Sequence, residues 1–134
     1  MRNRAGVVLV AVAAVLAVAV PAAEAKPTIG DGSCDSGDYC YYQDTNYGGS
    51  VLDDYSNTAV MDDYWYFNTN FSPNDRTSSM WNRSSSQAMF LWQNTNYGGN
   101  KACKSAGNFA SSLPTTGWSL GDNSASSMLV ASAC

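Results

Sequence analysis

The chain has 134 residues, with seven Lys and Arg, eleven Asp and Glu, no His, and a formal net charge of −4. This length suits a single domain, and the negative charge disfavours nucleic acid and anionic membranes as partners. Without histidine, neither a Ser-His-Asp nor a Cys-His catalytic arrangement can be built. We therefore expect that the protein is not an enzyme.

The first 25 residues have the three parts of a secretory signal peptide. Arg2 and Arg4 form a basic start, residues 6–20 form an apolar run, and residues 23–25 give the small-x-small cleavage pattern. The apolar run is shorter than the about 20 residues of a membrane span. We predict cleavage after Ala25, which leaves one secreted domain at residues 26–134 with a net charge near −5 and no membrane association.

The four cysteines are Cys34, Cys40, Cys103 and Cys134. In an oxidising compartment they indicate two disulfides. Of the three pairings that four cysteines allow, we predict Cys34–Cys40, which closes a small loop, and Cys103–Cys134, which ties the last residue into the fold. A zinc site is the alternative, but the chain has no histidine and no cysteine pair at zinc-finger spacing.

Helical periodicity is nearly absent after the signal segment, while Gly, Asn, Asp, Ser and Tyr are abundant. Short runs bounded by turn residues predict strands. These runs are residues 39–43, 50–55, 64–67, 80–82, 89–92 and 128–131. Many short strands with turn-rich connections indicate an all-β fold, either a sandwich or a barrel.

One turn occurs twice, as DTNYGG at residues 44–49 and as NTNYGG at residues 94–99. A repeat at a fixed spacing indicates that the fold itself is repeated. Each copy lies between two extended runs and predicts a tight hairpin. In the first copy, Gly48 and Gly49 are expected to supply the positive φ angles that such a turn needs, and Gly98 would share this role with Gly99 in the second.

Aromatic packing is expected across each hairpin. Tyr47 is predicted to fold over Tyr41 or Tyr42. In the second copy, Tyr97 is predicted to fold over residue 91 or 92, which are Leu and Trp.

A second pair of matching stretches follows the hairpins, at residues 74–79 (NDRTSS) and 122–127 (DNSASS). Both have the form [ND][ND]xx[ST]S followed by hydrophobic residues. The first begins 30 residues after Asp44 and the second 28 residues after Asn94. Each half of the chain therefore consists of a hairpin, a variable loop, a polar six-residue turn and a strand.

These paired patterns resemble the microbial, calcium-binding members of the βγ-crystallin superfamily. The resemblance implies a β-sandwich of two Greek-key motifs, at about residues 38–83 and 88–131. The family's hairpin pattern is matched by Tyr41, Tyr47 and Gly49, and in the second half by Tyr97 and Gly99, with Leu91 in place of the leading aromatic. The resemblance also implies that the hydroxyls of Ser79 and Ser127 hold the folded hairpins.

The lead-in CDSGDYC, the following YQDTNYGG and the actinobacterial-type signal are similar to the streptomycete metalloprotease-inhibitor family. This likeness implies inhibition of a secreted metalloprotease. No reactive-bond motif is recognisable in the sequence.

The two six-residue patterns offer the oxygen ligands that a hard cation such as calcium prefers. The first has Asn74, Asp75, Ser78 and the Arg76 carbonyl. The second has Asp122, Asn123, Ser126 and the Ser124 carbonyl. By resemblance the two sites exchange ligands. One carboxylate in each pattern predicts dissociation constants on the order of 10⁻⁴–10⁻³ M. The alternative is that both stretches are ordinary polar turns.

Two further features are open to a functional interpretation. Asp53-Asp54 and Asp62-Asp63 are paired carboxylates, but neighbours on a strand point to opposite faces, so we predict solvated charges rather than a glycosidase pair. The run Tyr64, Trp65, Tyr66 and Phe67 would expose two aromatic rings if it alternates as a strand. Those rings would bind a cell-wall polysaccharide or a protein partner, as in a killer-toxin-like module; alternatively, the four residues complete the core.

Overall fold

A computed structural model describes residues 30–113 and 120–134 of the chain. The predicted signal peptide lies outside these residues. The strands are β1 (Tyr39–Tyr42), β2 (Val51–Asp54), β3 (Ser79–Asn82), β4 (Ala88–Asn94), β5 (Gly98–Lys104), β6 (Phe109–Ala110) and β7 (Ser127–Ala131). Three short 3-10 helices accompany them: η1 (Thr45–Tyr47), η2 (Met61–Asp63) and η3 (Thr95–Tyr97). None of the helices in the described ranges has the length and apolar character that crossing a membrane requires.

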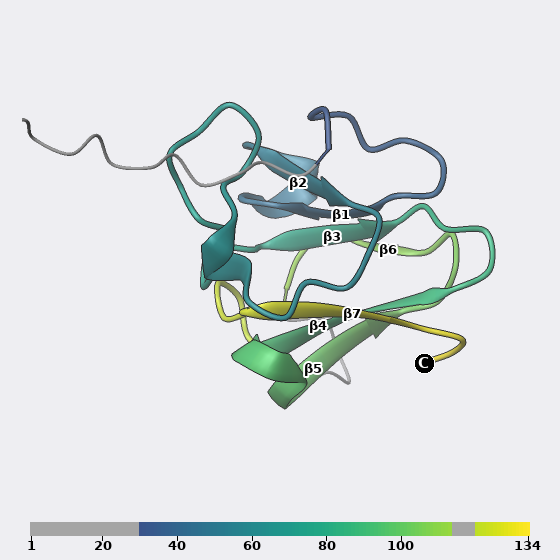
Figure 1. Ribbon diagram of the computed structural model, residues 1–134. Coiled ribbons are helices and arrows are strands. Elements are labelled where there is room, and N and C mark those ends of the chain that lie inside the picture. Colours follow the sequence, from purple (N-terminus) through teal and green to yellow (C-terminus); the bar gives the residue numbers. More distant parts are fainter. Residues whose placement is uncertain (1–29, 114–119) are drawn as a thin grey trace, which may run out of the picture.

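The strands form two antiparallel sheets that pack face to face (Figure 1). One sheet has the order β2-β1-β3-β6, and the other has the order β5-β4-β7. Tyr41 in β1 lies opposite Leu52 in β2 and Met80 in β3. The corresponding strand of the other sheet places Leu91 opposite Ala102. The matching registers confirm the all-β prediction and show the repeat in three dimensions.

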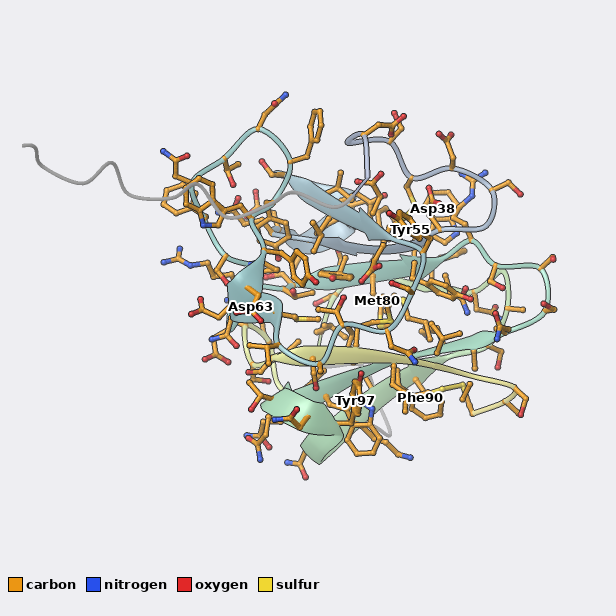
Figure 2. The ribbon with its side chains drawn as sticks, in the orientation of Figure 1. Asp38, Tyr55, Asp63, Met80, Phe90 and Tyr97 are labelled. Carbon is orange, nitrogen blue, oxygen red and sulfur yellow. A yellow bond between two sulfur atoms is a disulfide. The ribbon has the colours of Figure 1, made fainter. Side chains whose placement is uncertain are left out.

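The core lies between the sheets and is built from both repeats. Tyr41, Leu52 and Met80 are fully buried on the inner face of the first sheet, and Leu91 and Met128 are fully buried on the second. Figure 2 shows Met80 lying between the two sheets. Burial of each such large side chain stabilises the fold by about 1.5–3 kcal/mol, so these alternating positions account for much of the driving force.

Each sheet also receives a piece of the other half of the chain. Strand β6, from the second half, pairs with β3 in the first sheet, with Ala110 opposite Met80. In return, Thr58 from the first half forms a bridge to Met128 in β7, with backbone bonds of 2.9 and 2.8 Å. The two repeats are therefore interlocked by exchanged segments rather than merely stacked.

The predicted strand at residues 64–67 is wrong. The segment follows η2 without joining either sheet, and it curls because the Tyr66 amide bonds to the Phe71 carbonyl at 2.9 Å and Asn68 has a φ of 55°. Tyr66 is fully buried in the core, and Tyr64 packs against the core from its edge. The assignment of Tyr66 to a partner-binding surface is therefore also wrong, since no partner can reach its ring.

The turn prediction is correct for one glycine of each hairpin. Gly48 and Gly98 have φ angles of −89° and −104°, so they do not need glycine's freedom. Gly49 has a φ of 68°, and a Cβ atom built there would lie 2.8 Å from the Asp44 carboxylate. The other left-handed positions are Asn46 and Tyr47, with φ angles of 56° and 59°.

Tyr47 folds over Tyr42, as one of the two predicted alternatives. The two rings meet edge to face with centroids 5.6 Å apart, and Tyr47 also contacts Trp81 at 5.5 Å. Tyr41 points into the core instead. In the second half, Lys101 covers the ring of Trp92, with the ammonium 5.0 Å from the ring centroid.

Both predicted disulfides are confirmed. Cys34 pairs with Cys40, and Cys103 pairs with Cys134, with Cα atoms 5.9 and 5.8 Å apart. The second bond ties the last residue of the chain to β5.

The acidic pair that ends β2 is buried, so the prediction of solvated charges is wrong there. Asp54 is fully buried and accepts hydrogen bonds from the Thr58 hydroxyl and two following amides. Asp53 is 3% exposed, and burial raises the pKa of its carboxyl group. Asp62 and Asp63 are exposed as expected. Asp54 holds the turn after β2, whereas Asp53 accepts from the amides of Asp31 and Gly32 at 2.8 and 3.2 Å, so the two carboxylates do not converge on a common bond.

Candidate metal centre

The two polar six-residue stretches lie against each other. We call residues 74–79 loop 1 and residues 122–127 loop 2. Loop 1 leads into β3 and loop 2 into β7, and Figure 1 shows these strands starting at the same end of the sandwich. The Asp75 amide bonds to the Ala125 carbonyl at 2.8 Å, and the Asn123 amide bonds to the Thr77 carbonyl at 3.1 Å. The repeat thus brings the predicted ligands of both halves together.

The second residue of each loop has a left-handed backbone. Asp75 has a φ of 53° and Asn123 a φ of 50°, a conformation that Asp and Asn tolerate better than other side chains. Their side chains therefore reach across to the opposite loop. Ser126 Oγ lies 3.4 Å from Asp75 Oδ1, and Ser78 Oγ lies 3.2 Å from Asn123 Oδ1. Each cross-loop pair combines an oxygen from one loop with a hydroxyl from the other.

The first residue of each loop adds further oxygens. Asn74 Nδ2 donates to Asp75 Oδ2 at 3.2 Å, and Asn123 Nδ2 donates to Asp122 Oδ2 at 3.3 Å. The other oxygen of the first side chain, Asn74 Oδ1, is buried and has no hydrogen-bond partner among the described residues. A buried acceptor without a donor is unfavourable, and a cation would satisfy it.

A hollow of about 680 Å³ lies beside loop 1. Its lining includes Asp44, Asp62, Asn74, Asp75, Ser78 and Asn123. Asp44 and Asp62 are outside the predicted ligand set. No local pattern links Asp62 to loop 1, because only the folded chain brings it beside the loop.

The donor set fits a hard cation. Carboxylate, amide, hydroxyl and carbonyl oxygens are the ligands that calcium takes, and both loops offer these groups, although the Arg76 side chain also lines the hollow. Within residues 30–113 and 120–134, no three His, Cys, Asp or Glu side chains form a group that could hold a metal. Any ion at these loops would therefore depend on neutral oxygens together with one or two carboxylates.

The last serine of each loop bonds to the neighbouring hairpin. Ser79 Oγ donates to the Asp44 carbonyl at 2.6 Å and accepts from the Tyr47 amide at 3.1 Å. In the second half, Ser127 Oγ donates to the Asn94 carbonyl at 2.7 Å and accepts from the amide of residue 97 at 3.0 Å. These bonds fix each hairpin to the start of a core strand.

Sequence reasoning missed the residues beneath loop 1. The Tyr66 hydroxyl donates to the Arg76 carbonyl at 3.2 Å and lies 3.0 Å from Thr77 Oγ1. Burial raises the pKa of Tyr66, so its hydroxyl keeps its proton and remains a donor. Tyr66 lies ten residues before Arg76 in an irregular segment, and no local pattern links the two.

Solved structures with similar folds are βγ-crystallin domains. One is a structure described under the evolution of the eye-lens βγ-crystallin domain fold, with a TM-score of 0.60 and 19% sequence identity. The match covers 77% of this chain and 93% of the other chain. A βγ-crystallin from an Archaea has a TM-score of 0.53 and 24% identity, covering 71% and 98%. A double mutant of clostrillin in complex with nickel has a TM-score of 0.53 and 20% identity, with the same coverage.

No curated protein sequence matches the chain. The family described as Peptidase inhibitor family I36 matches residues 28–104, which is more than half of the sequence. Together with the two interlocked Greek keys, this match means that the chain has the βγ-crystallin fold and belongs to peptidase inhibitor family I36.

Proposed function

We propose that the protein is a secreted inhibitor of an extracellular peptidase whose fold is stabilised by calcium at the two facing loops. The observation that carries the calcium part is the pair of cross-loop contacts, Asp75 with Ser126 and Asn123 with Ser78. Family membership supports the inhibitor part. The two disulfides are consistent with an oxidising environment outside the cell.

The proposed ligands are the groups that the two loops present. They are the side chains of Asn74, Asp75, Ser78, Asp122, Asn123 and Ser126, with the carbonyls of Arg76 and Ser124. A bound ion would act as an electrostatic cross-link between segments that are about fifty residues apart in the sequence. Because each loop has one carboxylate, we expect dissociation constants on the order of 10⁻⁴–10⁻³ M.

Thermal unfolding with intact disulfides tests the calcium sites. If two sites bind near 10⁻⁴ M, then 5 mM calcium stabilises the fold by about 2 kcal/mol per site relative to chelator. For a domain of this size, we expect the melting temperature to rise by more than about 10 °C. Asp75→Ala combined with Asp122→Ala should abolish the rise.

The control for that experiment is Asp35→Ala combined with Asp38→Ala, which removes the same charge elsewhere. Asp63 lies in η2, which bonds to loop 2, and so marks the end of the sandwich that carries the loops. Figure 2 shows Asp38 toward the opposite end. This control should keep the full calcium response. An equal rise in melting temperature with calcium in both double variants, or no rise in the unaltered protein, would show that the loops are ordinary turns.

Inhibition is tested with a secreted metalloprotease of the thermolysin type. The proposal expects peptidase activity to fall linearly to near zero as the molar ratio approaches one, and the inhibitor to stay intact. The same protein after reduction and alkylation should not inhibit, because the fold that presents the binding surface is lost. Full peptidase activity at a tenfold excess of folded protein would refute inhibition of this enzyme class.

The proposed activity rests on binding, not on catalysis. The chain has no histidine, and its two adjacent Asp pairs are either buried in structural bonds or exposed. A saccharide-binding role for residues 64–67 is not favoured, since Tyr66 lies inside the core.

A further inference from the structure

We propose that Tyr66 is a positioning residue for the metal centre: its buried hydroxyl fixes the Arg76 carbonyl and thereby sets the affinity of one of the two calcium sites. This inference rests on the proposed calcium binding. It adds a residue outside both loops and makes the two sites unequal.

The contacts place Tyr66 directly beneath loop 1. Its side chain is fully buried, and its hydroxyl donates to the Arg76 carbonyl at 3.2 Å. Thr77 is also fully buried, lies 3.0 Å from the same hydroxyl, and donates to the Pro73 carbonyl at 3.3 Å. Two hydroxyl groups therefore hold the carbonyls on either side of Asn74 and Asp75. A buried network of this kind strongly restricts the backbone that it contacts.

Tyr66 is itself fixed by its own short loop. Its amide donates to the Phe71 carbonyl at 2.9 Å. Its carbonyl accepts two bonds from Thr69, from the amide at 3.1 Å and from the hydroxyl at 2.9 Å. With the ring packed in the core and the backbone closed, the phenol has little freedom to follow a moving loop. Loop 1 is therefore held in one geometry before any ion arrives.

A carbonyl oxygen has two lone pairs, so the Arg76 carbonyl can accept from Tyr66 and still face a cation. Groups that hold a metal ligand in this way usually change metal affinity about 10- to 100-fold when they are removed. The reason is that a ligand already in position loses less conformational freedom on binding.

Loop 2 differs at the matching position. Thr77 corresponds to Ala125, which is fully buried and has no hydroxyl. The corresponding carbonyl, that of Ser124, therefore cannot share an equivalent threonine-linked network. Loop 2 is held by a different group, because the Ser124 hydroxyl donates to the Gly121 carbonyl at 2.6 Å. Removal of the Tyr66 hydroxyl should therefore change the affinity of one site and not of the other, although their sequence patterns match.

Tyr66→Phe tests the inference, because it removes only the hydroxyl and keeps the ring in the core. We would titrate the unaltered protein and the variant with calcium and follow backbone amide shifts by NMR, which reports each binding event separately. We expect one dissociation constant to rise about 10-fold and the other to remain unchanged. Thr77→Val, of equal volume, should weaken the same event and gives a second route if Tyr66→Phe folds poorly.

Tyr39→Phe is the matched control. Tyr39 belongs to the same core, is 3% exposed, and donates its hydroxyl to Gln87 Oε1 at 3.1 Å, away from both loops. This variant should lose comparable stability without calcium and keep both dissociation constants. Unchanged constants in Tyr66→Phe, or an equal rise in both, would overturn the positioning role while calcium binding itself stood. A lack of any calcium binding in the unaltered protein would remove both proposals.

Discussion

At the scale of single residues, a serine hydroxyl is the smallest group on which the hairpin geometry depends. Ser79 donates to one backbone group of the first hairpin and accepts from another, and Ser127 does the same in the second half. Both serines are fully buried. Two backbone groups of a tight turn are therefore satisfied by one side chain that belongs to a distant strand.

Ser79→Ala should lower the free energy of unfolding by about 1–3 kcal/mol, because it leaves a buried amide and a carbonyl without their partner. Ser127→Ala should behave similarly. Urea unfolding at a fixed calcium concentration measures the change. Ser85→Ala, at an exposed position, is the control and should change stability by less than about 0.5 kcal/mol. Equal values for Ser79 and Ser85 would show that the hairpin does not depend on the hydroxyl.

The sequence identified the residues that meet across the two loops where the information is local, and it missed those that depend on distant contacts. Asp75, Ser78, Asn123 and Ser126 sit in short patterns that repeat, so the sequence pointed to them directly. Tyr66 acts through the Arg76 carbonyl from a segment with no recognisable pattern. Its role depends on how the chain folds back on itself, which residue types and spacing do not encode.

At the scale of elements, the hairpin turn was predicted correctly, but the positions of its positive φ angles were predicted only in part. Two consecutive glycines indicate two positive φ angles, yet only Gly49 has one in the first copy. The backbone places its other left-handed residues earlier, at Asn46 and Tyr47. A bulky residue in this conformation is unfavourable by itself. The contacts of the Tyr47 ring with Tyr42 and Trp81 offset this.

Replacement of each glycine separates the two roles. Gly49→Ala should destabilise the fold by about 1–3 kcal/mol, because the backbone is left-handed there and the new methyl would lie 2.8 Å from the Asp44 carboxylate. Gly48→Ala is the matched control, since its φ of −89° suits any residue and the nearest atom, the Thr45 carbonyl oxygen, is 3.2 Å from the new methyl. Thermal unfolding of both variants should rank Gly49 as the more sensitive site. The opposite ranking would contradict the backbone assignment.

Strands with alternating or continuous apolar residues were predictable, and β1, β3, β4 and β7 lie where the sequence placed them. Residues 64–67 have the same aromatic composition but form no strand, because Tyr66 finds its partners in loop 1 and the chain must turn to reach them. Strand β6 has only two residues. It exists because β3 offers a free edge, and its own sequence gives no sign of it.

At the scale of the whole molecule, the disulfides act at both ends of the described chain. The bond between Cys34 and Cys40 closes the segment that leads into β1, and the bond between Cys103 and Cys134 spans 31 residues. In the chain-entropy account, a loop of that length stabilises the fold by about 3–4 kcal/mol. Calcium at the opposite loops would add its contribution to a fold that is already cross-linked, so the protein would remain folded at low calcium.

The exchange of Thr58 and β6 between the sheets has a consequence for the history of the fold. The first repeat made alone would lack β6, the second would lack the bridge from Thr58, and each would expose an unpaired edge. A second copy of the same repeat is the natural supplier of the missing segment. An ancestral gene encoding one repeat would therefore have produced a symmetric dimer, and fusion of two such genes would have turned a contact between two molecules into the interior of one.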